Sequence, residues 1–166
     1  MSAVDTKCVK FGEGGRRKLH FASIDDALRD AELIAESDRR GTLKRCGNWT
    51  AGQALGHVAG WITFALDGYP PDLRPPWFVK VILRMMKSKY MRGLPSGARI
   101  PKVEGGTKNT EVLSTEEGLA RLRTAWQRLG KTAPTRPNPV FGQLSHDEWI
   151  ALNLRHAELH QSFFVP

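Results

Sequence analysis

The pattern of apolar and polar positions predicts helices along most of the chain. After Ser23, a residue type that caps helix N-termini, apolar residues recur at three- and four-residue spacing, and Gly41 ends this first helix. A second helix opens near Thr50 and runs to Gly68. Because this helix is apolar over most of its surface, we expect it to lie at the centre of the fold.

Three more segments carry helical patterns. Residues 77–90, WFVKVILRMMKSKY, predict a helix that is apolar on one side and basic on the other. The last two helices are expected from Ser114 and over residues 146–164. Each is preceded by a capping box, in which Ser114 or Ser145 is followed three residues later by a glutamate. Residues 91–112 form a long irregular connection, and loops of this length are often functional.

No segment alternates between apolar and polar residues as a strand would, and no short hairpin turn is present. The chain is therefore predicted to be all-α: a four-helix bundle with long connections and an extra basic helical segment. Residues 1–16 are expected to form a flexible N-terminal tail, and residues 17–166 a single domain. Gly52, Gly56 and Gly60 repeat at four-residue spacing, which would let a neighbouring helix approach closely.

Composition excludes several classes of protein. The chain of 166 residues is 40% hydrophobic and 25% charged, as in globular proteins. It has no apolar run of the roughly 20 residues that a membrane helix needs, so no membrane association is expected. The stretch GRRKLHFAS resembles a twin-arginine signal, but no apolar region follows it. Cys8 and Cys46 fit neither a metal site nor a disulfide framework, which favours a reduced, cytoplasmic setting.

The net charge is +8, and much of it is concentrated between residues 74 and 108, where Glu104 is the single acid. This basic segment is either a solvated face or a surface that binds a phosphate- or carboxylate-bearing molecule. Nucleic-acid binding is not favoured, because the segment lacks a helix-turn-helix pattern and interleaved exposed aromatic residues. Its basic residues are Arg74, Lys80, Arg84, Lys87, Lys89, Arg92, Arg99, Lys102 and Lys108.

The candidate chemistry begins with two histidines in the last helix. His156 and His160 are four residues apart and share one stripe with Trp149, Leu152 and Asn153. Side chains at this spacing lie about 6 Å apart on one helix face, so both imidazoles can reach one metal ion. Histidine pairs of this kind also occur by chance on exposed helix faces, and that alternative stays open.

His57 is the third candidate ligand. It lies midway along the most apolar helix, on a face that it shares with Gln53, Trp61 and Phe64. If the second and last helices are neighbours, three imidazoles without a fourth protein ligand form an open, catalytic type of site. The alternative is a core histidine with a satisfied hydrogen bond. His20 and His146 are not favoured as ligands, and His146 is expected to be exposed.

Four further residues are candidates for a pocket around the ion. Gln53 and Asn153 each lie one turn before a candidate ligand, where they would orient a substrate or form interhelical hydrogen bonds. Trp61 and Trp149 would wall the pocket or belong to the core. No acid lies on the ligand stripe, since Glu158 projects away from it. No general base is therefore identified beyond a metal-bound species.

Three segments in this order resemble the DinB-like (YfiT-like) superfamily of bacterial metal-binding four-helix bundles, within a branch of unknown function. They are RRKLHFASIDDALRDAELIA, GNWTAGQALGHVAGWITFALDGYP and PVFGQLSHDEWIALNLRHAELHQSFF, and the resemblance covers the chain from Arg17 onward. It implies a divalent metal ion, commonly zinc, nickel or iron, held by His57, His156 and His160. Relatives often carry a further histidine where this chain has Asn153.

The resemblance also implies a range of functions. Its characterised members are thiol-dependent S-transferases, isomerases of thiol conjugates or metal-dependent hydrolases, and many form dimers. We therefore expect a metal-dependent thiol S-transferase or hydrolase that acts on a small-molecule substrate, such as a low-molecular-weight thiol, and that forms a homodimer. A metal with a free coordination position would make bound water or thiol nucleophilic near neutral pH. The alternative is a non-catalytic metal- or ligand-binding bundle.

Overall fold

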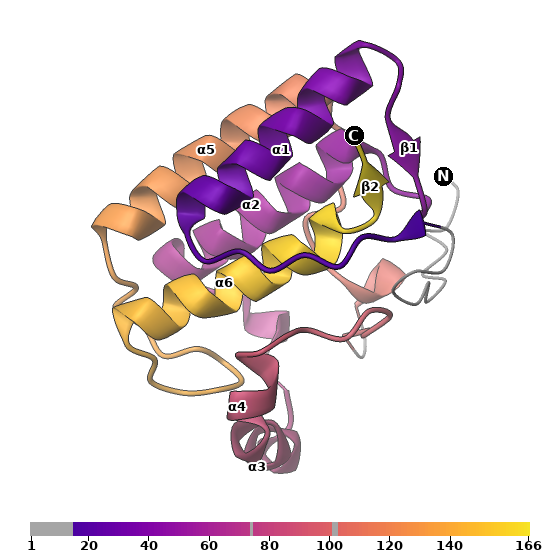
Figure 1. The fold of residues 1–166 in the computed structure, drawn as a ribbon. Helices are drawn as coiled ribbons and strands as arrows, with labels where there is room; N and C mark the ends of the chain where they lie inside the picture. The colour runs from indigo at the N-terminus through magenta and orange to yellow at the C-terminus, as the bar shows by residue number, and fades with distance from the viewer. Residues whose placement is uncertain (1–14, 74, 101–102) are drawn as a thin grey trace.

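The computed structural model describes residues 15–73, 75–100 and 103–166, and within them the chain is mostly helical (Figure 1). The long helices are α1 (Ile24–Arg39), α2 (Ala51–Asp67), α5 (Thr115–Lys131) and α6 (His146–Gln161). The shorter elements are β1 (Lys44–Arg45), η2 (Pro71–Leu73), α3 (Trp77–Met85), α4 (Lys87–Tyr90), η3 (Glu104–Gly106) and β2 (Phe164–Val165). The prediction of an all-α fold is confirmed.

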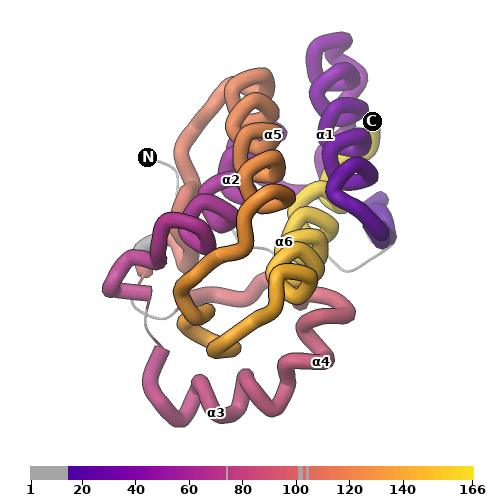
Figure 2. The backbone as a smooth tube through the Cα atoms, turned by 90° about the vertical axis from the view of Figure 1, so that its left-hand side faces the viewer, coloured from indigo at the N-terminus to yellow at the C-terminus, as the bar shows by residue number. Residues whose placement is uncertain are grey.

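The four long helices pack around one apolar core (Figures 1 and 2). Helix α2 packs most extensively against α5 and also contacts α6 and α1. This agrees with its apolar sequence, because a helix in contact with three others needs apolar residues on several faces. The largest fully buried side chains of this core are Trp126, Trp149, Leu55, Ile62, Leu122 and Leu129.

The helices begin where their capping residues predict. Ser23, Thr50 and Ser145 each form a complete capping box at the start of α1, α2 and α6. At α5 the box is only half formed. Ser114 accepts a hydrogen bond from the Glu117 amide, but the Glu117 carboxylate pairs with Arg121 on the next turn.

A small two-stranded sheet corrects the prediction that no strand is present. Strand β1 pairs antiparallel with β2, and Lys44 lies opposite Val165. Helix α6 consequently ends at Gln161, and Phe164 belongs to the strand. Two residues are too few to produce an alternating pattern, so the sequence carries no signal for this pairing.

The glycine stripe of α2 lies against an extended segment, residues 107–114, and against the first turn of α5. A Cβ atom at Gly52 would lie 2.2 Å from the carbonyl oxygen of Leu113, and one at Gly60 would lie 2.3 Å from Cγ of Asn109. Gly118 of α5 approaches the backbone of Gly52 equally closely. The glycines do allow the close approach that was predicted, but the part of the chain that approaches them is mainly this extended segment and not a neighbouring helix.

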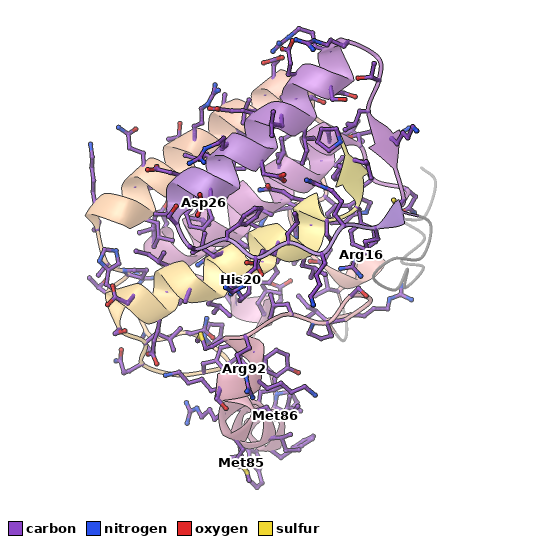
Figure 3. The ribbon with its side chains drawn as sticks, viewed as in Figure 1. Arg16, His20, Asp26, Met85, Met86 and Arg92 are labelled. Atoms are coloured by element: carbon purple, nitrogen blue, oxygen red, sulfur yellow. The ribbon has the colours of Figure 1, made fainter. Side chains whose placement is uncertain are left out.

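Helices α3 and α4 lie at one end of the molecule, below the four long helices in both views (Figures 1 and 2). The predicted helix over 77–90 is interrupted at Met86, and neither part has a buried residue. Met85 is 81% exposed and projects away from the body of the protein (Figure 3). Two basic residues of the segment, Arg74 and Lys102, lie outside the described residues. No described helix has the length and apolar character needed to cross a bilayer.

The start of the described chain is held against α1 and the end of α6. Arg16, which the sequence prediction placed in the tail, is buried and donates a hydrogen bond from Nε to the Ser162 hydroxyl. Arg17 donates two hydrogen bonds to the Asp30 carboxylate and a third to the Phe164 carbonyl. Residues 1–14 of the predicted tail lie outside the described residues.

Candidate metal centre

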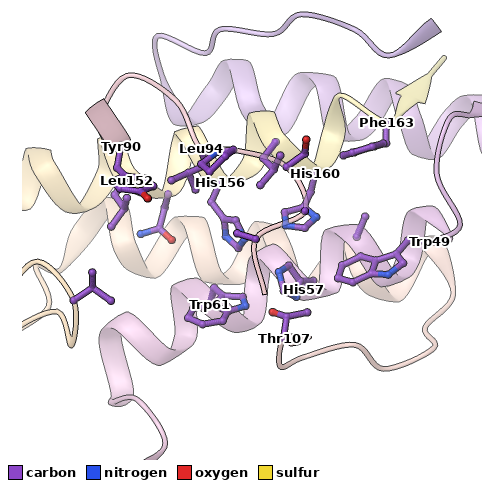
Figure 4. Close-up of a pocket in the computed structure, with 18 of the residues that line it drawn as sticks. Trp49, His57, Trp61, Tyr90, Leu94, Thr107, Leu152, His156, His160 and Phe163 are labelled. Carbon is purple, nitrogen blue, oxygen red and sulfur yellow. The ribbon is translucent and has the colours of Figure 1, made fainter. Parts of the chain in front are cut away.

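Three histidines from two helices converge on one point beside a cavity (Figure 4). His156 and His160 project from successive turns of α6, and their ring centroids are 4.7 Å apart. His57 faces them from the middle of α2, with centroid distances of 5.0 Å to His156 and 4.4 Å to His160. The packing of α2 against α6 therefore brings together all three predicted ligands.

The main chain fixes the orientation of His57. Its Nδ1 lies 2.8 Å from the carbonyl oxygen of Lys108. A carbonyl can only accept, so Nδ1 carries the proton and Nε2 keeps its lone pair. Histidine ligands in metal sites commonly make this kind of outer hydrogen bond, which sets the tautomer and the ring orientation.

Burial keeps the three imidazoles neutral at physiological pH. It lowers the pKa of His57 from 6.5 to about 4, against the smaller opposing effect of the backbone contacts at Lys108 and Asn109. Burial also lowers the pKa of His156 and His160 well below 6.5, and repulsion between the protonated rings adds to the effect. Neutral imidazole is the form that binds a metal, so protons compete weakly at this site.

The three residues fit a divalent ion. Each offers one ring nitrogen, and these nitrogens lie within 4.8 Å of one another. Two nitrogens bound to one ion at 2.0–2.1 Å in tetrahedral geometry are about 3.3 Å apart. The described residues thus provide three nitrogen ligands, which is the number found in open metal sites.

The centre opens into a cavity of about 350 Å³. Of the predicted pocket residues, Trp61 and Asn153 line this cavity. Gln53 and Trp149 do not line it. The Gln53 side chain accepts a hydrogen bond from the Thr50 amide as part of the α2 capping box, and Trp149 is 1% exposed within the core.

Residues 14–166 match the model of a family described as proteins of unknown function (DUF1569). The chain belongs to the DUF1569 family. No curated protein and no solved structure matches the chain.

An aromatic shell surrounds the imidazoles of this DUF1569 protein, and part of it was missed by sequence reasoning. Trp49 stacks on His160 with a ring-centroid distance of 5.3 Å and also meets the edge of His57 at 4.9 Å. Trp61 stands on the other side, 6.0 Å from His156. Trp49 directly precedes the Thr50 cap and packs against a small apolar cluster that contains Ala54, the hydrophobic-staple position. Its place beside the helix start could therefore be predicted from the sequence.

Two other polar residues of α6, Asn153 and Glu158, have structural partners. The Asn153 amide donates to the carbonyl of Trp149 one turn earlier, while its side chain still borders the cavity. Glu158 lies on another face of α6, where it accepts from the Phe21 amide and pairs with Arg155. No carboxylate therefore joins the histidines among the described cavity-lining residues.

The other two described histidines lie apart from the centre. His20 is exposed and accepts a hydrogen bond from Arg155. His146 corrects a prediction: it is half-buried, not exposed, because its Nε2 donates to the Leu129 carbonyl at 2.6 Å. This bond joins the start of α6 to the end of α5.

Proposed function

We propose that this DUF1569 protein binds a divalent metal ion, zinc, nickel or iron, through His57, His156 and His160, and that it acts as a metal-dependent thiol S-transferase or hydrolase of the DinB-like type. The observation that carries the proposal is the cluster of three neutral imidazoles at the wall of a cavity. A structural site would be closed by a fourth protein ligand, whereas three ligands facing a cavity suit a catalytic one.

The metal would supply Lewis-acid chemistry, which activates a thiol or a water molecule as a nucleophile near neutral pH. The residues of the chain would orient the ligands, limit the access of water and position the substrate. The Lys108 carbonyl holds the ring of His57 in the ligating tautomer. Trp49 and Trp61 enclose the imidazoles and limit the access of water. Asn153 would position a substrate from the cavity wall.

The rival proposal is a non-catalytic metal- or ligand-binding protein. It is favoured by one specific observation: no aspartate, glutamate, lysine or arginine is present among the described residues that line the cavity. A reaction there would depend on the metal alone for acid–base chemistry, as the sequence already indicated. The metal-loaded protein, incubated with thiols and electrophilic or ester substrates, distinguishes the two proposals by turnover.

Metal analysis of purified protein tests the site itself. After loading with zinc and dialysis, wild type is expected to retain about one ion per chain, and His156→Ala to retain little, because two ligands hold a divalent ion far more weakly than three. His20→Ala, which removes an exposed histidine outside the centre, is the matched control and should retain the ion. Equal zinc content in wild type and His156→Ala would refute the assignment.

Three further parts of the proposal rest on the sequence. Two of them, the placement of the DUF1569 chain among DinB-like four-helix bundles and a homodimeric state, rest on the resemblance, whereas the third, a cytoplasmic location, rests on the two cysteines, Cys8 and Cys46. The packing of α1, α2, α5 and α6 around one core is compatible with the first of these. Sedimentation equilibrium tests the second, because a dimer has twice the chain mass of 18.6 kDa.

A further inference from the structure

We infer that the cavity binds a largely apolar small molecule whose single polar head group faces the three histidines and which carries no second charge. This inference rests on the proposed metal site and narrows the substrate class. It separates the ligand from amino-acid-derived thiols such as glutathione, which carry additional carboxylates and an ammonium group.

The cavity wall is uncharged throughout its described lining. Its polar groups are amides, hydroxyls and the histidine rings, such as Asn153 and Thr107, and the rest of the wall is mainly aliphatic and aromatic. The main apolar contributors are Leu94, Val140, Phe141, Leu152, Leu159 and Phe163. A carboxylate or ammonium group buried against such a wall would lose its hydration without gaining a partner, which weakens its binding.

The basic segment borders the cavity but turns its charges away from it. Tyr90, Leu94 and Ala98 line the cavity, whereas no lysine or arginine between them does so. Lys87 forms an ion pair with Glu148 of α6 at 2.6 Å. The high positive charge of this region therefore provides no anion site inside the cavity.

Lys108 illustrates the same separation within one residue. Its backbone carbonyl accepts the hydrogen bond from His57, while its ammonium group pairs outside with Asp72 at 2.5 Å. A lysine beside the centre thus contributes a main-chain acceptor and no charge to the cavity. Arg16 lies behind the wall, with its guanidinium carbon 4.2 Å from the centre of the Phe163 ring, and it is not part of the described lining. Within that lining, the positive charge that a ligand meets would be that of the ion held by the neutral imidazoles, which suits one anionic or Lewis-basic head group.

The shape of the cavity fits an elongated ligand. Leu152, Tyr90 and Leu94 lie toward one end, Trp49 and Phe163 toward the other, and the histidines lie between them (Figure 4). A cavity of about 150 Å³ holds one benzene ring, so 350 Å³ has room for about two rings. The head group would reach the histidines, and an aryl or alkyl body would pack on one of the apolar ends.

A matched set of ligands tests the inference with cobalt(II) as a spectroscopic probe ion. The protein is loaded with cobalt(II) and titrated with benzyl mercaptan or with its ortho, meta and para carboxylates, and the visible spectrum of the ion is followed. We expect benzyl mercaptan to perturb the spectrum and each carboxylate to bind at least about tenfold more weakly, a difference of about 1.4 kcal/mol. A carboxylate that binds as tightly as the parent thiol would overturn the inference.

Substitution of the wall supplies a second, independent measurement. Leu152→Lys places a cation at the apolar end of the cavity, and Leu152→Gln is a control of similar size without charge. We expect Leu152→Lys, but not Leu152→Gln, to shift the preference toward a carboxylate by about tenfold or more. Cobalt-loaded Leu152→Lys with an unchanged preference would contradict the inference. If that variant does not fold, the wild-type titrations still decide.

The outcomes also separate this inference from the proposed function. If wild type binds no cobalt(II) and His156→Ala behaves identically, the metal site itself is refuted. If wild type binds cobalt(II) but does not distinguish the charged from the uncharged thiols, the metal site stands and the inference about the ligand is wrong.

Discussion

The ring of His57 combines deep burial with a hydrogen bond to the main chain. It is 2% exposed, and its Nδ1 proton is held by the Lys108 carbonyl. Burial disfavours the protonated ring and outweighs the hydrogen bond, which acts in the opposite direction, so the pKa of His57 falls to about 4. His156 and His160 follow the same trend, since their pKa values are also lowered by burial. Without metal, the folded protein keeps these three histidines neutral in mild acid, whereas the unfolded chain protonates them below a pH of about 6.5.

This difference predicts that the metal-free protein loses stability in mild acid. Unfolded histidine has a pKa near 6.5, so the contribution is fully present above that pH and is lost as the pH falls toward about 4. For His57 the contribution is about 3 kcal/mol at neutral pH. Urea denaturation at a series of pH values measures it. His57→Gln, which cannot titrate, should make the pH dependence shallower, while His156 and His160 still contribute to it. If the free energy of unfolding of wild type stayed constant or increased as the pH was lowered from 6.5 to 4, the expectation would be contradicted.

At the scale of elements, the centre depends on how closely the segment before α5 approaches α2. Gly60 leaves room for Asn109, whose backbone adopts a φ of 57°. A positive φ is uncommon for a residue other than glycine, and asparagine tolerates it better than most. Lys108 directly precedes this turn and offers its carbonyl to His57. The glycine stripe thus positions the outer partner of a candidate ligand.

Gly60→Ala is therefore expected to weaken metal binding through His57. The added Cβ would lie 2.3 Å from Cγ and 2.8 Å from Cβ of Asn109, so the turn must move and the Lys108 carbonyl with it. Loss of such an outer hydrogen bond typically costs about 10–100-fold in metal affinity. Competition with a chromophoric chelator measures the affinity for zinc.

Gly56→Ala is the matched control for this substitution. It lies one turn earlier on α2, and its Cβ would meet the side chain of Leu113, 2.5 Å from Cδ1, and not the turn at Asn109. We expect it to lower the thermal midpoint without a comparable loss of zinc affinity. Equal affinities in the two variants would show that the approach at Gly60 does not orient His57.

The difference between regular helices and irregular segments also explains how much could be predicted from the sequence. Ser23, Thr50 and Ser145 marked the helix starts because their capping chemistry is local. The three histidines could be grouped because helical spacing and the apolar face of α2 limited where they point. For Gln53 the sequence left a place in the pocket and a structural hydrogen bond open, because a side chain one turn before His57 is also the third residue after the Thr50 cap, where it forms the capping bond. The irregular cavity walls between Tyr90 and Thr107 have no periodicity from which a prediction could start.

At the scale of the whole molecule, two regions differ in how firmly they are held. The four long helices share one core, and Arg17 ties the start of the described chain to Asp30 of α1 and to the last strand. Helices α3 and α4 bury no residue and contact mainly each other. Regions with few buried contacts open locally at little cost in free energy, so this end should open before the rest.

Limited digestion with trypsin tests this difference. Among the described residues, we expect the first cuts after the basic residues between Lys80 and Arg92, because local opening exposes their backbone. Arg121 and Arg128 of α5 are the internal control, since their helix packs on α2 while their side chains form exposed ion pairs. Mass spectrometry of early fragments locates the cuts. Earlier cleavage in α5 would contradict the expectation.

The same digestion tests whether this end of the molecule is coupled to the cavity. Tyr90 and Leu94 form part of the cavity wall, so a ligand packed against them should stabilise the closed arrangement. With cobalt(II) bound, benzyl mercaptan is expected to slow cleavage between Lys80 and Arg92 severalfold, while cobalt(II) alone should change it little, because the histidines lie on α2 and α6. Protection by the metal alone would mean that the ion orders this end directly. No protection by the thiol would mean that the ligand does not reach Tyr90 and Leu94.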